Sequence, residues 1–216
     1  MKHPDFFDQV PRLRVRDPLA ELLGCAEGGV LEYGYADAVR LTGHSCPTVA
    51  GAYWITWLAL AELYPSTLPQ RGGVRVEYRQ TDRDGSTGVF ASVVQMLTGA
   101  ADERGFRGIA GRHSRVGLQR YAPDLPRFMR YTRLDNGAAV DAAVDLSLMP
   151  PDPVLSGLLG CVERGHADPT AIAQLGALWQ RRVKSLLLDH ADDRGIFIVR
   201  RVERRRLSRA PTSLAV

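Results

Sequence analysis

Residues 42–64 read TGHSCPTVAGAYWITWLALAELY, a histidine and a cysteine two positions apart followed by a long apolar run. Pro47 suits the first position of a helix, where its missing N–H leaves no bond unmade. From there to about Tyr64, apolar residues fall on nearly every side of the helix, which is typical of a helix buried all round. The pattern favours a homodimer in which a second subunit covers the outer face, and a central position beneath a curved sheet of the same chain explains it equally well.

The rest of the chain mixes strand and helix signals. Val74–Arg79 alternates between apolar and polar residues, which predicts a half-buried strand. Residues 128–148 contain two further strand patterns joined by an Asp-Asn-Gly turn at 135–137, a strong hairpin signal. Two C-terminal helices begin at Pro153 and Pro169. Because strands and helices do not alternate as βαβ units, we expect an α+β fold, with a mixed or antiparallel sheet packed around the apolar helix.

The chain divides into three predicted parts. Residues 1–29 form an N-terminal arm with a short helix that Asp17 caps, and residues 30–200 form the α+β domain. Residues 201–216 form an arginine-rich tail. Two short strands are also predicted near 106–110 and 114–119.

The histidine and cysteine of residues 42–64 indicate a site for metal binding or catalysis. In an extended segment, residues i and i+2 point to the same side, so His44 and Cys46 can bind the same ion or the same substrate. Cys46 lies just before the predicted helix, at the end where the helix dipole favours negative charge. A thiolate serves both as a metal ligand and as a nucleophile, so the placement suits either role.

Two short blocks carry a resemblance to a known family. Gly43–Pro47 resembles the Gly-His-x-Cys-Pro-Gly signature of the FmdE-like family, whose members belong to formylmethanofuran dehydrogenases, and Val93–Gly99 resembles its stretch ending in Leu-Thr-Gly. The resemblance covers roughly residues 30–115. It implies a metal-binding protein that is accessory to one-carbon or redox metabolism, with the catalytic step on other subunits. The chain departs from the family at Thr48, where a glycine is common, and at Ala100, where a cysteine is expected.

A metal at this position needs further ligands from elsewhere in the chain. Mixed sets of histidine, cysteine and carboxylate suit zinc, and a site with fewer than four protein ligands keeps a position open for water or substrate. An acidic loop at 81–87 and a Gly/Arg-rich segment at 100–125 supply candidates. The candidate ligands are His44, Cys46, Asp82, Asp84, His113 and Cys25.

Two alternatives do without the metal. In one, His44 and Cys46 line a cavity that binds a small molecule. In the other, the protein is a thiol-dependent enzyme with Cys46 as nucleophile and His44 as its base. The sequence does not decide between these alternatives and zinc.

Composition narrows the class of protein. The 216 residues contain three widely spaced cysteines, which argues for a reducing compartment. The N-terminus carries no apolar signal segment and the longest apolar run is too short to span a bilayer, so we expect a cytoplasmic protein. The net charge of +4 comes with an arginine cluster at Arg200–Arg209, but no nucleic-acid-binding motif accompanies it. We expect a solvated tail and no membrane or nucleic-acid partner.

Overall fold

The apolar stretch forms the central helix of the fold, α3 (Pro47–Leu63), in a computed structural model that describes residues 2–203. The other helices are α1 (Pro18–Leu22), α2 (Tyr35–Thr42), α4 (Thr87–Thr98), α5 (Pro153–Glu163) and α6 (Pro169–Lys184). The strands are β1 (Leu13–Arg16), β2 (Val30–Tyr33), β3 (Val74–Tyr78), β4 (Gln119–Tyr121), β5 (Met129–Arg133), β6 (Ala139–Val144) and β7 (Phe197–Arg201). Short helical turns complete the chain at Asp5–Gln9, Glu27–Gly29, Leu146–Leu148 and Ser185–Asp189.

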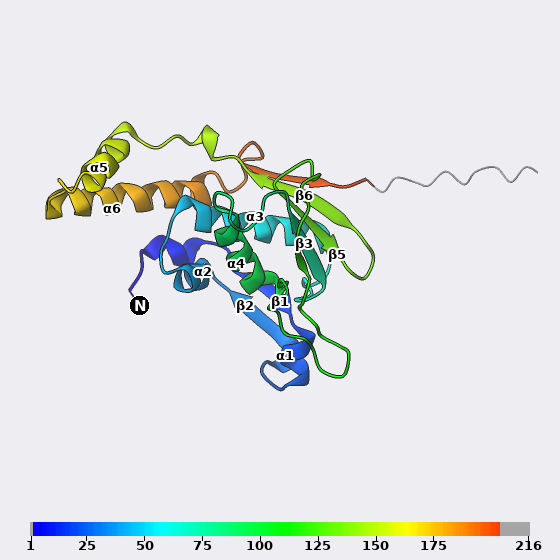
Figure 1. The fold of residues 1–216 in the computed structure, drawn as a ribbon. Coiled ribbons are helices and arrows are strands. Elements are labelled where there is room, and N and C mark those ends of the chain that lie inside the picture. The colour runs from blue at the N-terminus through cyan, green and yellow to red at the C-terminus, as the bar shows by residue number, and fades with distance from the viewer. Residues whose placement is uncertain (1, 204–216) are drawn as a thin grey trace, which may run out of the picture.

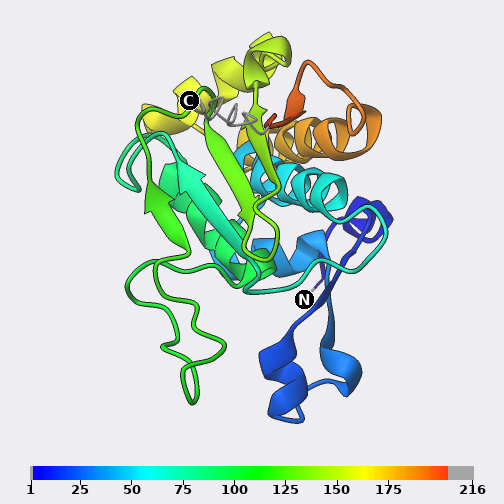
Figure 2. The ribbon, with the colours of Figure 1, turned by 90° about the vertical axis from the view of Figure 1, so that its right-hand side faces the viewer.

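Helix α3 is covered by its own chain. It packs against α4 and against strands β6 and β7, and most of its residues are buried (Figures 1 and 2). Gly51 lies against Val144 of β6, where an added Cβ would sit only 3.3 Å from the valine side chain. The central position therefore accounts for the apolar pattern, and no second subunit is needed to explain this helix.

A five-stranded sheet forms the second layer, with strand order β4-β3-β5-β6-β7. Strands β3 and β4 pair in parallel and the other neighbours are antiparallel, so the sheet is mixed. The predicted hairpin between β5 and β6 is confirmed, and Asn136 in its turn accepts a hydrogen bond from the N–H of Ala138. The α+β class predicted from the sequence is confirmed.

The outward face of this sheet carries a row of alternating charges. The side chains in register across the five strands are Arg120, Glu77, Arg130, Asp141 and Arg200. Within this row, Arg130 forms two hydrogen bonds to Asp141, of 2.6 and 3.0 Å. Opposite charges directly across strands stabilise a sheet, so this face is suited to water while the other face packs on the core.

The segment from 101 to 118 differs from its prediction. It forms a long loop with a single bridge between Ile109 and Arg112, and strand β4 begins only at Gln119. Ala110 and His113 adopt positive φ angles, as do the glycines at 108 and 111. These left-handed residues turn the chain repeatedly, which an extended strand does not allow.

The N-terminal part is more ordered than the predicted arm. Phe6 and Phe7 are buried, and the Phe7 ring packs edge-on against Tyr35 at 4.8 Å between centroids. Strands β1 and β2 pair with each other, so hydrogen bonds cross the predicted boundary between residues 29 and 30. The short helix α1 begins as expected, with Asp17 accepting hydrogen bonds from two backbone N–H groups.

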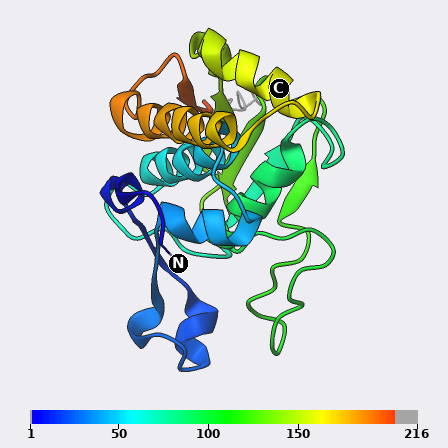
Figure 3. The same cartoon turned by 90° about the vertical axis from the view of Figure 1, so that its left-hand side faces the viewer.

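The C-terminal part places the predicted helices in a hairpin. Helices α5 and α6 pack on each other (Figure 3), and they project away from the sheet (Figure 1). Strand β7 includes Arg200 and Arg201, while the remaining arginines of the predicted tail, from Arg204 onward, lie outside the described residues. Within residues 2–203, none of the helices is long and apolar enough to cross a membrane.

Candidate functional site

The His-x-Cys loop joins α2 to α3. Gly43 ends α2 in the left-handed conformation, with a φ of 76°. Cys46 is the N-cap of α3, and its Sγ accepts a hydrogen bond of 3.4 Å from the N–H of Val49. The predicted position of the thiol at the start of the apolar helix is therefore confirmed.

The two side chains lie in different surroundings. His44 is exposed, and its Nδ1 lies 3.0 Å from the carbonyl oxygen of Thr42. Cys46 is buried and belongs to the hydrophobic core. The polar contacts of the loop are made instead by Ser45, whose hydroxyl donates to Gln180 and whose carbonyl accepts from the indole of Trp179 at 2.9 Å. The loop thus serves as a docking point for α6.

The other candidate ligands lie on separate loops. Asp84 accepts hydrogen bonds from the N–H and hydroxyl of Thr81, at 3.0 and 2.7 Å, and so shapes its own turn. His113 is half-buried in the 101–118 loop, and Cys25 is exposed beyond the end of α1. Asp82 is exposed, and it lines the cavity described below.

These positions bear on the predicted zinc site. Among residues 2–203, no three histidine, cysteine, aspartate or glutamate side chains gather closely enough to hold a metal ion. Zinc sites in proteins use three or four such ligands, so the described residues do not fit the ion as they stand. Zinc binding at His44 and Cys46 stays a prediction, which metal analysis of the purified protein and its Cys46→Ser variant tests.

The burial of Cys46 makes a prediction about thiol reactivity. On brief treatment of the folded protein with iodoacetamide, we expect Cys25 to be alkylated first, then Cys161, and Cys46 only after unfolding, because exposure decreases in that order. Peptide mass spectrometry reads the three sites separately, and denatured protein provides the full-labelling control. Alkylation of Cys46 ahead of Cys25 would instead favour the thiol-dependent enzyme.

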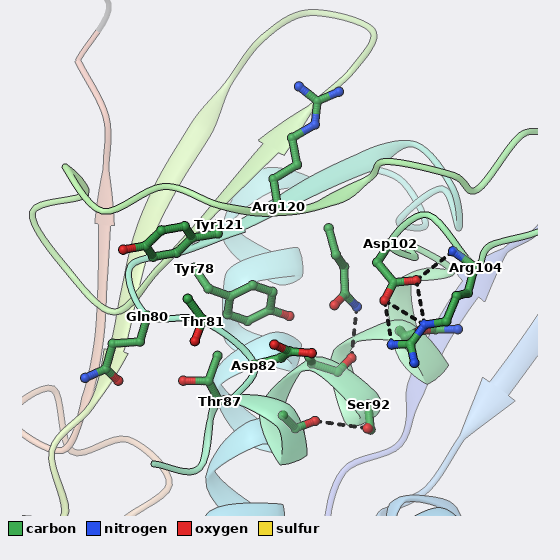
Figure 4. A pocket seen from close by; sticks show the side chains of 14 residues that line it. Tyr78, Gln80, Thr81, Asp82, Thr87, Ser92, Asp102, Arg104, Arg120 and Tyr121 are labelled. Carbon is green, nitrogen blue, oxygen red and sulfur yellow. Dashed lines mark hydrogen bonds and ion pairs between the residues drawn. The ribbon is translucent and has the colours of Figure 1, made fainter. Parts of the chain in front are cut away.

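A cavity of about 450 Å³ lies elsewhere, between helix α4 and the ends of strands β3 and β4. Figure 4 shows its lining side chains, which come from β3, the acidic loop after it, α4, the 101–118 loop and β4. Its volume lies within the range of small-molecule sites. Of the residues that the sequence singled out, Asp82 lies in this lining.

Two buried hydroxyls of the lining have no hydrogen-bond partner. Tyr78, the last residue of β3, is 4% exposed, and Thr87, the first residue of α4, is 1% exposed. Neither the Tyr78 hydroxyl nor the Thr87 Oγ1 has a partner among the described residues. Burial raises the pKa of Tyr78 well above its ordinary value of 10, so the phenol stays protonated and able to donate. An unpartnered buried polar group costs about 1–3 kcal/mol, so both hydroxyls call for an explanation.

The charges around the cavity are largely neutralised. Asp102 accepts three hydrogen bonds from the Arg104 guanidinium, of 2.6 to 3.3 Å, and these bonds hold the pKa of Asp102 below its ordinary value. Arg120 donates to the carbonyl of Gly117, and its guanidinium is turned away from Tyr78 in Figure 4. Asp82 forms no ion pair within the part of the chain that the structure describes. The other polar side chains of the lining are uncharged amides and hydroxyls, namely Gln80, Thr81, Ser92, Gln95, Gln119 and Tyr121.

Gln119 fixes the floor of the cavity. Its side-chain amide donates to the carbonyls of Ala91 in α4 and Ala100 after it, both at 2.9 Å. These two hydrogen bonds hold β4 beside α4. Gln119 occupies an inward-facing position of β4, opposite Val76 of β3.

Sequence reasoning missed most of this site. The alternation of Val74–Arg79 did indicate that Tyr78 shares the inward face with the two valines. Nothing in the sequence indicated that the Tyr78 and Thr87 hydroxyls share one cavity with Asp102 and Gln119. That juxtaposition depends on the parallel pairing of β3 with β4, which lie about 40 positions apart.

A scan against protein-family models and a search of curated proteins each gave no match to this chain. The resemblance to the FmdE-like family therefore stays a prediction that depends on Gly43–Pro47 and Val93–Gly99. Ala100, where that family has a cysteine, is fully buried in the hydrophobic core.

Proposed function

We propose that this protein binds a small, uncharged polar molecule in the cavity between α4 and strands β3 and β4. The observation that carries the proposal is that two residues of the cavity lining, Tyr78 and Thr87, have buried hydroxyls without a partner among the described residues. Both oxygen atoms are closed off from solvent, so a ligand in the cavity reaches them when a lining side chain moves aside, and its hydrogen bonds then remove the cost of their burial. This is the hypothesis of metal-free small-molecule binding, moved from the His-x-Cys loop to another part of the fold.

The lining supports an uncharged ligand over an anion. Asp82 offsets the charge of Arg120, and the Arg104 guanidinium is already occupied by Asp102, so the lining offers no net positive charge to an anion. Amide and hydroxyl side chains can both donate and accept, which suits a ligand rich in amide, carbonyl or hydroxyl groups. The exposed ring of Tyr121 lies at the rim, where it offers an apolar surface to a planar ligand.

The Tyr78→Phe variant should weaken ligand binding without lowering the free energy of unfolding of the ligand-free protein. Because the Tyr78 hydroxyl has no partner, its removal should leave the free energy of unfolding of the ligand-free protein unchanged or raise it by about 1 kcal/mol. Tyr131→Phe is the matched control on neighbouring strand β5, since the buried Tyr131 hydroxyl bonds Thr56 Oγ1 at 2.9 Å. Its removal should lower the free energy of unfolding by about 1–2 kcal/mol. Urea unfolding measures both variants.

Binding is tested with defined probes. Saturation-transfer NMR on the wild-type protein with nicotinamide, uracil and glucose covers amide, carbonyl and hydroxyl ligands, and inorganic phosphate serves as the anionic comparison. We expect at least one uncharged probe to bind, phosphate not to bind, and Tyr78→Phe to weaken binding roughly tenfold. If Tyr78→Phe costs as much stability as Tyr131→Phe, the hydroxyl is already satisfied in the free protein and the proposal fails.

The proposal leaves the predicted family role in place as a hypothesis. An FmdE-like protein accessory to one-carbon or redox metabolism would use this cavity for its ligand, with or without a metal near His44. Self-association is also proposed, and the surface that supports it is not α3.

A further inference from the structure

The α5–α6 hairpin leaves apolar side chains exposed. The sequence of α5, PVLSGLLGCVE, is nearly as apolar as that of α3, but only Leu155 of α5 is buried. Val154, Val162 and Ile172 are exposed large apolar residues on this hairpin. A pair of helices packed only on each other cannot cover such faces, whereas four helices can enclose an apolar core.

Among residues 2–203, the contacts that anchor the hairpin lie at its base. Trp179 and Gln180 of α6 hydrogen-bond to Ser45, and Val183 is fully buried, so this end is fixed to the body. Helix α5 and the N-terminal part of α6 project beyond the rest of the molecule, as Figure 1 shows. The exposed apolar surface therefore lies on a fixed and accessible arm.

The charges at the two ends of the hairpin are opposite in sign, so two hairpins placed antiparallel bring opposite charges together. Its tip has a net negative charge, from Glu163 and Asp168 with one cation, Arg164, between them. The last turn of α6, at the base, is basic and carries Arg181, Arg182 and Lys184. Within residues 2–203, Glu163, Arg181 and Lys184 form no ion pair. If two hairpins pack in opposite directions about a two-fold axis, the acidic tip of each lies beside the basic base of the other.

We infer that two copies of this chain associate through their α5–α6 hairpins, which pack antiparallel as a four-helix bundle. A two-fold axis makes the surface self-complementary, because both copies contribute the same residues to the contact. The axis passes near Gly176, the middle of α6, where no atom of residues 2–203 lies within 4 Å of an added Cβ. A second copy covers the exposed apolar side chains and also pairs the charges at both ends of the hairpin. An unrelated partner needs to cover only the apolar side chains.

Mass measurement of the full chain tests the inference. Light scattering after size exclusion should give twice the chain mass of 23.8 kDa. Ile172→Glu should raise the dimer dissociation constant roughly tenfold or more, because it places a charge in the apolar contact. Leu22→Glu is the matched control, since Leu22 on α1 is 59% exposed and Ile172 is 55% exposed. This control should remain dimeric, and circular dichroism should show both variants folded.

A cysteine placed on the axis tests the geometry. Gly176→Cys, in a background with Cys25→Ser and Cys161→Ser, should form an intermolecular disulfide on mild oxidation. A monomeric wild-type protein, or a dimer that Ile172→Glu leaves as tight as before, would overturn the inference. Dimerisation without the Gly176→Cys disulfide would overturn the antiparallel arrangement. None of these outcomes depends on whether the cavity beside α4 binds a ligand.

Discussion

Replacement of Asp17 by asparagine is expected to lower the free energy of unfolding by about 3–5 kcal/mol, the usual cost of breaking a buried ion pair. Asp17 is 3% exposed, and its two carboxylate oxygens bind different arginines. Oδ2 accepts from Arg71 at 2.8 Å and Oδ1 accepts from Arg115 at 2.6 Å. Asparagine still caps α1 but leaves both guanidiniums without their counter-charge.

The surroundings of Arg115 explain why the loss of its partner, Asp17, should lower the free energy of unfolding strongly. Arg115 is buried in a space that two glycines leave open, because a Cβ on Gly72 would lie 1.5 Å from its Nη1 and one on Gly99 would lie 2.9 Å away. Its Nη1 already lacks a hydrogen-bond partner in the part of the chain that the structure describes. The guanidinium therefore has no other acceptor to which it can turn when Asp17 is removed.

Asp145→Asn is the control for Asp17→Asn. Asp145 caps the short helical turn Leu146–Leu148 through a 3.0 Å hydrogen bond from the N–H of Ser147, but it is exposed and forms no ion pair with an arginine among residues 2–203. Aspartate and asparagine are nearly equal as helix caps, so this variant should change the free energy of unfolding by less than about 0.5 kcal/mol. Guanidinium unfolding of both variants gives the comparison, and similar small losses would show that the Asp17 ion pairs contribute little.

The same pair predicts how stability depends on pH. Burial acts to raise the pKa of Asp17, but the hydrogen bond from Arg71 and the charge of Arg115 outweigh it, so the pKa is lowered on folding. The stabilisation is therefore complete above the unfolded pKa of about 3.9 and is lost as pH falls through the lower folded value. The difference in unfolding free energy between wild type and Asp17→Asn should be constant from about pH 7 to pH 5 and shrink below about pH 4.

Truncation of Trp54 to alanine should lower the free energy of unfolding by about 3–5 kcal/mol. Trp54 is buried in α3, and its indole N–H donates to the carbonyl of Ala191 at 2.8 Å. Removing the ring leaves a cavity beside the central helix and frees the segment that leads into β7. Thermal or guanidinium unfolding measures the loss.

Trp57→Ala provides the comparison within the same helix. Trp57 stacks on Trp54 at 4.9 Å between ring centroids, but it is only partly buried and its N–H bond is long, at 3.3 Å. Its truncation should cost about 1–2 kcal/mol, since less apolar surface returns to water. Equal losses in the two variants would contradict the central position of α3.

Local signals in the sequence predicted most of the helices and strands. The starts of α1, α3, α5 and α6 were marked by a capping residue and a proline at the next position, and both features act within one turn of helix. The β5–β6 hairpin was predicted for the same reason, because its turn residues determine its geometry. The 101–118 loop was predicted wrongly as strands, since its left-handed residues include Ala110 and His113, which rarely adopt positive φ.

Sequence alone determined the class of fold, the burial of α3 and the position of Cys46 at its first turn, because periodicity and helix capping depend on residues a few positions apart. Only the tertiary structure decided which polar groups meet. It left His44 exposed and buried Cys46, placed Asp17 between two arginines far along the chain, and brought Tyr78 and Thr87 to one cavity. These contacts depend on strand order and on how the loops pack, which no spacing within a short stretch can specify.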